Sequence, residues 1–207
     1  MTDRPITILT VDDHQFLRRG IKALIEEEED MQVVAEASSA LEALELYGNL
    51  RPDVTLMDLQ LSEHSGLEAI ASIRRKHPSA RIIVLTTYGG DVLVRRALKA
   101  GAVGYLLKSM IRKDLIEAIR FVHAGKRHIP PAVAASLAEH YQDDDLSERE
   151  IEVLKAVAEG TSNKIIASRL FISEATVKAH MKNVMLKLGA SDRTHAVVIA
   201  TNRGFMM

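Results

Sequence analysis

The sequence has no cysteine and no tryptophan, and aromatic residues make up only 4% of its 207 residues. The absence of cysteine excludes disulfides and thiolate metal sites. No apolar run approaches the roughly 18 residues needed to span a bilayer, and the first residues lack a charged-then-apolar secretory pattern. With 47% hydrophobic and 27% charged residues, the composition is globular rather than disordered. We therefore expect a soluble cytoplasmic protein, without a membrane partner, of one large or two small domains.

The net charge of −1 hides an asymmetry along the chain. Residues 1–125 contain 16 Lys/Arg and 18 Asp/Glu, residues 126–145 contain 2 and 4, and residues 146–207 contain 9 and 6. The C-terminal part is therefore basic, which is compatible with nucleic-acid binding but does not establish it.

Short apolar runs alternate with helical periodicity in the first 125 residues. The runs, which have the length of buried strands, are 6–11, 31–37, 54–57, 81–86 and 103–107. The segments with helical spacing are 14–27 and, roughly, 39–50, 64–76, 90–100 and 111–124. Five strands alternating with five helices predict an α/β fold with a parallel sheet covered on both faces.

The second part of the chain has a different pattern. Residues 126–145 open with a Pro pair and close with three Asp, which predicts an interdomain linker with one short helix at 132–141. Residues 146–207 predict a separate all-α domain of four helices. Ser147 and Glu150 form a capping box for its first helix, Gly160 is a C-cap and Ser173 caps the third helix. The tight turn between the second and third helices fits a helix-turn-helix.

Polar side chains follow four of the predicted strands where each strand ends. Asp12 and Asp13 follow the first strand, Asp58 the third, Thr86 the fourth and Lys108 the fifth. In a parallel sheet these ends share one edge, where ligands bind. Each residue alone has an ordinary explanation, such as a turn, a helix cap or a solvated strand end. Their joint placement predicts one acidic pocket.

Oxygen ligands with no Cys or His select a hard cation, Mg²⁺ before Ca²⁺. We expect Asp13 to bind the metal directly and Asp12 through water. Asp58 can then attack phosphorus and become an acyl phosphate, with Lys108 and the Thr86 hydroxyl on phosphoryl oxygens. His14 is expected at the pocket mouth as a packed or capping residue rather than as a ligand.

Four ordered motifs, "VDDH", "LMDLQL", "VLTTY" and "GYLLK", resemble the receiver domain of bacterial two-component response regulators. The segment from "LSEREIEVLKAVAEG" to "DRTHAV" resembles the LuxR-type helix-turn-helix. Together they are similar to the NarL/FixJ family, over nearly the whole chain. The domains expected are a receiver at 1–125, a linker at 126–145 and a DNA-binding domain at 146–207.

The resemblance implies a flavodoxin-like (βα)5 receiver that is phosphorylated on Asp58 by a sensor histidine kinase or a small phosphodonor. It implies Mg²⁺ on Asp12, Asp13, Asp58 and the main-chain carbonyl of Gln60, and Thr86 with Tyr105 as the switch pair. Two positions depart from the common family pattern, because Ser62 and Ser109 stand where many receivers have proline. The second departure favours a trans peptide after Lys108.

The helix expected at 173–188 has a buried stripe and a basic face. The stripe is Val177, Met181, Val184 and Leu188. The face, which we expect to enter the major groove of promoter DNA, comprises Lys178, Ala179 and Lys182. Further candidates for phosphate contacts are Thr161, Ser162, Lys164 and Arg193. A solvated basic helix face is the plain alternative.

Three hypotheses follow. The first is a phosphorylation-gated transcription regulator, homodimeric when phosphorylated, that acts on no external substrate as an enzyme. The second is an aspartyl-phosphate phosphatase, although such enzymes usually place Asp-x-Asp after the first strand. The third is a protein-interaction module with a basic tail. The sequence does not specify the signal, the kinase, the promoters, the dimer surface, or whether the output is activation or repression.

Overall fold

The computed structural model of this chain describes residues 4–62, 65–140 and 145–206. Its internal contacts divide the chain into two compact units. The first unit comprises residues 1–87 and 94–134, and the second comprises residues 88–93 and 135–207. The domain limits expected from the sequence, residues 125 and 146, remain predictions.

The first unit contains a five-stranded sheet in the order β2-β1-β3-β4-β5, and every neighbouring pair of strands is parallel. The strands are β1 (Ile6–Val11), β2 (Met31–Ala37), β3 (Val54–Asp58), β4 (Ile82–Thr86) and β5 (Gly104–Leu107). Each predicted apolar run forms one of them, because a parallel sheet covered on both faces buries nearly every strand residue. The predicted flavodoxin-like order is confirmed.

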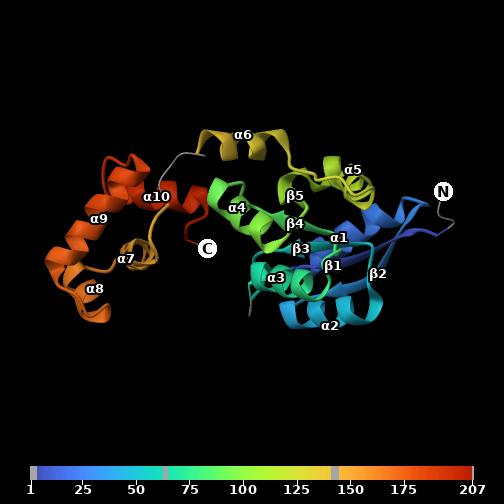
Figure 1. Ribbon diagram of the computed structural model, residues 1–207, viewed down its shortest axis with the longest axis horizontal. Coiled ribbons are helices and arrows are strands. Elements are labelled where there is room, and N and C mark those ends of the chain that lie inside the picture. The colour runs from blue at the N-terminus through green and yellow to red at the C-terminus, as the bar shows by residue number, and fades with distance from the viewer. Residues whose placement is uncertain (1–3, 63–64, 141–144, 207) are drawn as a thin grey trace. The chain divides into compact units, whose positions relative to one another are not determined.

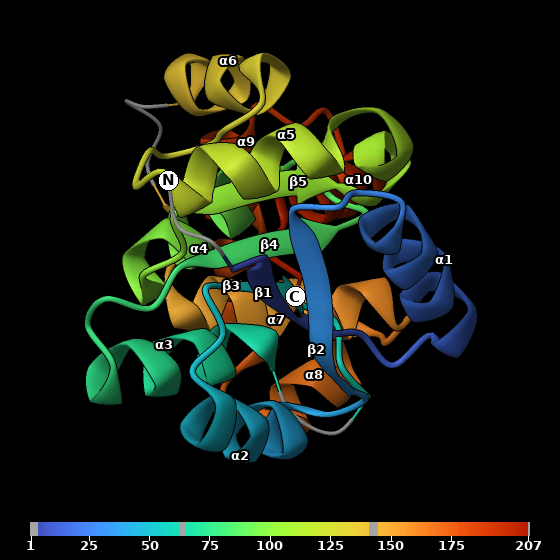
Figure 2. The ribbon, with the colours of Figure 1, turned by 90° about the vertical axis from the view of Figure 1, so that its right-hand side faces the viewer.

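Helices cover both faces of this sheet (Figures 1 and 2). They are α1 (Gln15–Glu26), α2 (Ala40–Leu50), α3 (Gly66–Lys76), α4 (Asp91–Ala100) and α5 (Ile111–His123). Helices α1 and α5 contact each other on one face, while α2 and α3 contact each other on the other. Ile21 and Ile25 of α1 and Leu115 and Ile119 of α5 are buried in one cluster with strand residues such as Ile8. This packing holds the carboxyl ends of the strands at one edge.

The strand ends differ slightly from the sequence-based expectation. Asp58 is the last residue of β3 rather than the residue after it, because its backbone pairs in register with Leu85 of β4. Thr86 likewise closes β4 and pairs with Leu107. Lys108 begins a short 3₁₀ turn, η1 (Lys108–Met110), that leads directly into α5. The backbone of all three positions is therefore held by regular structure.

The C-terminal part is helical, as predicted. Its helices are α6 (Pro131–Glu139), α7 (Glu148–Ala158), α8 (Asn163–Arg169), α9 (Glu174–Leu188) and α10 (Arg193–Arg203). Helix α6 corresponds to the expected helix 132–141, whose last residue lies outside the described residues. The capping box of Ser147 and Glu150 is present at the start of α7. Gly160 lies two residues past the end of α7 with a φ of 78°, where glycine avoids the clash of a Cβ.

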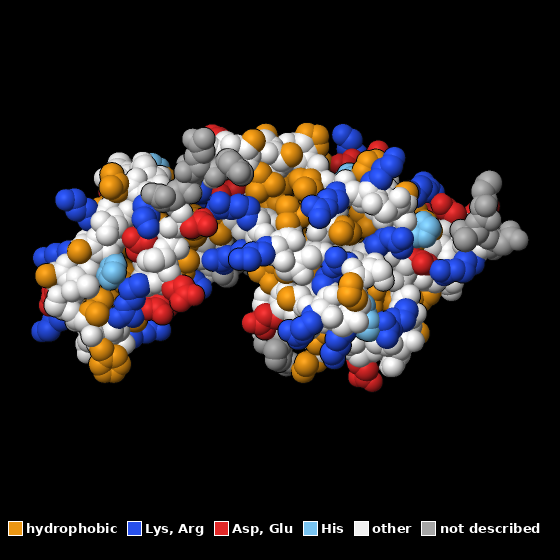
Figure 3. All heavy atoms as spheres, in the orientation of Figure 1, with side chains coloured by type: hydrophobic (Ala, Val, Ile, Leu, Met, Phe, Trp, Pro, Cys, Tyr) orange, Lys and Arg blue, Asp and Glu red, His pale blue; other side chains and the backbone are white. Residues whose placement is uncertain are grey.

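The four helices α7 to α10 pack around a second buried cluster, which also includes Val92 of α4. The predicted stripe of α9 is buried: Val177, Met181, Val184 and Leu188. The opposite side of α9 is solvent-exposed, and lysine and arginine side chains are spread over α8 and α9 in the space-filling view (Figure 3). The turn between these two helices contains Phe171, which has a φ of 55° and a side chain that is 95% exposed.

Candidate functional site

The predicted acidic pocket forms at the carboxyl edge of the sheet. Asp12 follows β1 and Asp58 ends β3, and each is only 1% exposed. The Lys108 ammonium lies 2.7 Å from Oδ2 of Asp58, to which it donates a hydrogen bond, and 2.7 Å from Oδ2 of Asp12. Three strands that are distant in sequence thus bring two carboxylates and one ammonium group together.

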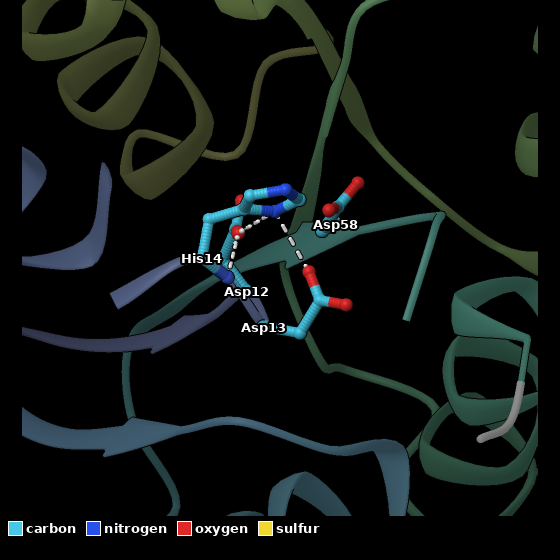
Figure 4. Close-up of side chains that lie close together, drawn as sticks. All are labelled: Asp12, Asp13, His14 and Asp58. Atoms are coloured by element: carbon cyan, nitrogen blue, oxygen red, sulfur yellow. Dashed lines mark hydrogen bonds and ion pairs between the residues drawn. The ribbon is translucent and has the colours of Figure 1, made fainter. Parts of the chain in front are cut away.

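Asp13 and His14 complete the pocket (Figure 4). One ligand atom from each of Asp12, Asp13, His14 and Asp58 lies within 4.8 Å of the others. The His14 ring is 71% exposed, and its Nδ1 lies 2.8 Å from Asp13 and 3.2 Å from Asp12. His14 is at the mouth of the pocket as expected. However, it is not packed, and its side chain caps no backbone group of α1.

Burial and neighbouring charges shift the pKa values of Asp58 and Lys108, the pair at the centre of the pocket. Burial raises the pKa of Asp58, with a smaller contribution in the same direction from the charge of Asp12. The hydrogen bonds from Lys108 and from the Gln60 main chain oppose this shift without cancelling it. Burial disfavours the charged form of Lys108, but the two carboxylates together outweigh burial and raise its pKa. Lys108 is therefore a cation that neutralises part of the acidic charge.

The loop after β3 approaches Asp58 closely. The main-chain N–H of Gln60 donates to Asp58 Oδ1 at 3.1 Å. The N–H of Gly66, at the start of α3, donates to the carbonyl of Leu59 at 3.2 Å and closes the loop. Ser62 is exposed, and residues 63–64 lie outside the described residues. On the opposite side of the pocket, the peptide bond after Lys108 is trans.

The two expected switch residues are in contact. Thr86 and Tyr105 are both fully buried, and their side chains share a hydrogen bond. Burial raises the pKa of the Tyr105 phenol, so the ring is neutral. Tyr105 pairs with Val84 on β4, which places the ring beside the strand that ends in Thr86. The hydrogen bond therefore connects Thr86, one strand away from Asp58, with Tyr105, two strands away.

The pocket fits a hard divalent cation. Asp12 Oδ2 and Asp13 Oδ1 are buried carboxylate oxygens that accept no hydrogen bond of regular geometry from the described residues. Their near neighbours are the nitrogens of Lys108 and His14. Clustered carboxylate oxygens are the ligands that hard cations prefer. We conclude that these carboxylates can hold a metal ion.

The candidate DNA-binding residues lie on the exposed side of the helix-turn-helix. Lys178, Ala179 and Lys182 are all exposed on α9. Lys178 and Arg193 both line a surface hollow of about 310 Å³, together with Asn163, Met181 and Met185. Figure 3 shows that this region is rich in lysine and arginine.

The remaining DNA-binding candidates lie around the start of α8. Ser162 is the N-cap residue of α8, and Lys164 is exposed in its first turn. Arg193, at the start of α10, donates to the main-chain carbonyl of Thr161 at 3.4 Å. Two predicted phosphate contacts, one just before α8 and one at the start of α10, are thus adjacent, a proximity that sequence spacing does not show.

Comparison with known proteins matches both halves of this description. Residues 8–120 match the response regulator receiver domain, and residues 144–200 match the luxR family of bacterial regulatory proteins. The chain belongs to the NarL/FixJ family of two-component response regulators. It is a transcriptional response regulator rather than an enzyme in the ordinary sense, which favours the first of the three hypotheses over the phosphatase and the interaction module.

Individual family members resemble the chain over almost their full length. It is 40% identical to the nitrate/nitrite response regulator protein NarL of Escherichia coli K12, covering 94% of each chain. It is 35% identical to the transcriptional regulatory protein LnrK of Bacillus subtilis, covering 96% of this chain and 98% of that protein. RcsB of Salmonella enterica serovar Typhimurium, bound to a promoter in the presence of phosphomimetic BeF₃⁻, superposes with a TM-score of 0.73 and 28% identity. That comparison covers 96% of this chain and 99% of RcsB.

A transmembrane helix is not found in the described ranges, since none of the helices there has the length and apolar character to cross a bilayer.

Sequence reasoning missed two features of this response regulator's pocket. The first is the contact of His14 with both neighbouring carboxylates. The second is Arg18, whose guanidinium reaches the main chain of Asp12 from α1. The only sequence signal for Arg18 is its position one helical turn after His14, on the side of α1 that faces β2.

Proposed function

We propose that this response regulator is switched by phosphorylation of Asp58. The observation that carries the proposal is the pairing of the buried Asp58 carboxylate with Lys108 at 2.7 Å, next to Asp12 and Asp13. A carboxylate at the end of a core strand is costly unless it is paired. A cluster of carboxylates around a lysine is well suited to phosphoryl transfer, which depends mainly on positioning and on charge stabilisation.

The transfer itself is a displacement at phosphorus. A carboxylate oxygen of Asp58 forms a bond to phosphorus while the bond from phosphorus to the leaving group of the donor breaks. The leaving group departs with the bonding electron pair, and the product is an acyl phosphate on Asp58. The donor is the phosphohistidine of a sensor histidine kinase or a small phosphodonor. In this proposal the chain catalyses only the phosphorylation and dephosphorylation of its own Asp58, and it turns over no external substrate.

The neighbouring groups stabilise the charge on the transferred group. Lys108 pairs with one phosphoryl oxygen, and the Thr86 hydroxyl donates to another. Asp12, Asp13, Asp58 and the main-chain carbonyl of Gln60 hold Mg²⁺. When bound, this ion neutralises the clustered carboxylates and the phosphoryl oxygens. This assignment is supported by one buried carboxylate oxygen of Asp12 and one of Asp13. Each has a nitrogen of Lys108 or His14 nearby but accepts no hydrogen bond of regular geometry from the described residues.

Phosphorylation then controls DNA binding. Movement of Thr86 toward the phosphoryl group carries the Tyr105 ring with it, because their side chains are hydrogen-bonded. This change favours a homodimer whose two α9 helices bind promoter half-sites about one helical turn apart. The exposure of Lys178, Ala179 and Lys182 supports this role of α9. The promoter-bound RcsB structure, obtained with a phosphomimetic, supports it by likeness.

Labelling of Asp58 is tested with the full chain, acetyl phosphate and Mg²⁺. We expect Asp58→Asn to abolish the incorporation of phosphate measured by mass spectrometry, because the amide is not a nucleophile. The matched control is Asp30→Asn, which removes an exposed carboxylate paired only with Arg120 among the described residues. Equal labelling of Asp58→Asn and the parent would show that Asp58 is not the acceptor.

DNA binding is tested by salt titration on duplex DNA. The affinity should fall with added salt, and Lys178→Ala and Lys182→Ala should each weaken binding. A variant that removes one lysine from a DNA phosphate should reduce the salt slope by about one. Lys155→Ala, which removes an exposed lysine of α7, serves as the control and should keep the parental slope. Parental affinity and slope in both α9 variants would exclude α9 as the DNA-binding helix.

A further inference from the structure

Nearly every polar atom of Asp12 has a hydrogen-bonding or charged partner. These partners hold the loop that carries Asp12 and Asp13. The Asp12 N–H donates to the carbonyl of Ala37 at 3.1 Å. Its Oδ1 accepts from the His14 N–H at 2.8 Å, and its Oδ2 lies 2.7 Å from Lys108. The one remaining group is the main-chain carbonyl, which accepts a hydrogen bond from the guanidinium of Arg18. Arg18 therefore completes the set of partners that fix this residue.

Arg18 lies in a confined position, although its Nε makes no hydrogen bond with the described residues. It extends from α1, its side chain is only 14% exposed, and its Nε lies 3.7 Å from Oε2 of Glu36. Glu36 lies in β2, next to the Ala37 whose carbonyl accepts from Asp12. Lys22 approaches the other side of the Glu36 carboxylate, with its Nζ 3.4 Å from Oε1. The guanidinium is thus held between the peptide of Asp12 and the end of the neighbouring strand.

A hydrogen bond at this carbonyl affects more than Asp12. The peptide group is planar, so the carbonyl of Asp12 and the N–H and Cα of Asp13 move together. Fixing the carbonyl therefore fixes the position of the Asp13 Cα, from which the Asp13 side chain extends. Oδ1 of Asp13 is buried and accepts no regular hydrogen bond from the described residues. The His14 ring, whose Nδ1 lies 2.8 Å from this oxygen, is 71% exposed, so the backbone provides the more rigid restraint on its position.

We propose that Arg18 is a positioning residue for the metal-binding pair Asp12 and Asp13. Its guanidinium orients the peptide between them so that both carboxylates face Asp58. This inference rests on the proposed function, which places a divalent cation on these carboxylates. Arg18 acts through Asp12 and touches neither the cation nor the phosphoryl group.

Two other roles predict different outcomes. If Arg18 acted mainly through its charge, its removal would strengthen cation binding, because a nearby positive charge repels a cation. The ion pair with Glu36 largely offsets that charge, so we expect positioning to dominate. If Arg18 only packed α1 onto the sheet, its removal would lower the melting temperature without changing the affinity of the folded protein for Mg²⁺.

The test is isothermal calorimetry of Mg²⁺ binding to the full unphosphorylated chain. Partners that orient metal ligands typically contribute roughly 10–100-fold to affinity, so Arg18→Ala should raise the Kd for Mg²⁺ by about tenfold or more. Arg18→Lys should lose less affinity than Arg18→Ala, because its ammonium can still donate to the Asp12 carbonyl, although it lacks the rigid, planar guanidinium. Labelling by acetyl phosphate in Arg18→Ala should approach the parental rate at saturating Mg²⁺.

Lys22→Ala is the matched control, since Lys22 also pairs with Glu36 but has Glu26, rather than Asp12, as its second partner. It should bind Mg²⁺ as the parent does. Unchanged or tighter binding by Arg18→Ala would overturn the inference. If Arg18→Ala does not fold, Arg18→Met, which keeps a long side chain but has no hydrogen-bond donor, takes its place, and a parental Kd for Mg²⁺ in that variant overturns the inference. If the parent does not bind Mg²⁺, the metal site in the proposed function is contradicted. If the parent and the Arg18→Ala variant bind Mg²⁺ equally, only the role of Arg18 is contradicted.

Discussion

Gly66 lies so close to the backbone of Asp58 that an added Cβ would stand 2.1 Å from the Asp58 carbonyl oxygen. The same Cβ would be 2.8 Å from the Cα of Leu59. Both atoms belong to the main chain and cannot move aside as a flexible side chain can. The loop that follows β3 can therefore close only on a residue without a side chain.

We expect Gly66→Ala to destabilise the protein by about 1–3 kcal/mol, as overpacking in a closely packed region does. It should also slow labelling at Asp58, because the displaced loop carries the Gln60 N–H that donates to this carboxylate. Urea unfolding and acetyl phosphate labelling measure the two effects. Gly48→Ala is the control, since a Cβ there would meet nothing within 4 Å and alanine favours a helix by about 1 kcal/mol over glycine. A stable, normally labelled Gly66→Ala would contradict the steric argument.

Lys108→Ala should strengthen cation binding while impairing phosphorylation. Without the Lys108 ammonium, the buried carboxylates of Asp12 and Asp58 lose the positive charge that both of them contact. A bound cation then relieves more repulsion than in the parent. The rise in melting temperature on adding saturating Mg²⁺ should be larger in the variant, and its labelling rate should be lower. Lys113→Ala on the exposed side of α5 should behave as the parent. An equal Mg²⁺-induced rise in both proteins would rule out this role for Lys108.

The pair of Glu150 and Lys187 should make the helical domain sensitive to acid. Burial alone would raise the pKa of the nearly buried Glu150 carboxyl, but hydrogen bonds from Lys187 and Ser147 lower it below its usual value of 4.5. The Lys187 ammonium lies 2.9 Å from Glu150. Since the folded-state pKa is below the unfolded value, the carboxylate stabilises the fold above about pH 4.5. That stabilisation is lost as the pH falls through the folded-state pKa.

We therefore expect Glu150→Gln to lose about 1–3 kcal/mol at pH 7, the usual contribution of a hydrogen bond to a charged group. The difference from the parent should shrink as the pH falls below 4.5 and through the lower folded-state pKa, at which the carboxyl of the folded parent becomes protonated. Urea unfolding followed by circular dichroism across this range measures it. Glu148→Gln, which removes an exposed carboxylate in the same first turn of α7, should have a smaller effect. A difference that does not change with pH would exclude the charged pair as its source.

Phe171→Gly should stabilise the helix-turn-helix. The residue has a φ of 55° and an exposed ring, so glycine relieves the left-handed strain without removing buried apolar packing. We expect a gain of about 0.5–1 kcal/mol, since the steric cost of this conformation, about 1–2 kcal/mol, is partly offset by the freedom of glycine in the unfolded chain. Phe171→Ala separates the two causes, because it removes the ring but keeps the Cβ. Equal stability of the glycine and alanine variants would mean that backbone strain is not the cause.

The fold and the residues that form the acidic pocket could be predicted from the sequence, because each depends on a local pattern. Apolar runs of strand length marked the sheet, and Asp12, Asp58 and Lys108 followed those runs where parallel strands share an edge. The capping box of Ser147 and Glu150 was predictable for the same reason, since its two residues are three positions apart. The structure shifts these elements by one or two residues without changing their order.

Other relationships join residues that are far apart in the sequence and carry no local signal. Glu150 pairs with Lys187 across 37 positions, and Arg193 meets Thr161 across 32. The link from Arg18 through Glu36 to β2 and the close approach of Gly66 to Asp58 are of the same kind. Each depends on how helices pack, which is set by the sum of many weak interactions rather than by any short motif.

The sequence by itself thus determined the parallel α/β domain, the helical domain after it and the residue types at the ends of the strands, because periodicity and strand order are local properties of the chain. Only the tertiary structure decided which carboxylate oxygen faces Lys108, how deeply Asp58 is buried and which guanidinium holds the Asp12 peptide. Those features control charge and geometry in the pocket. Electrostatic interactions depend on distance and on exclusion of water, and both arise only when the distant segments have packed together.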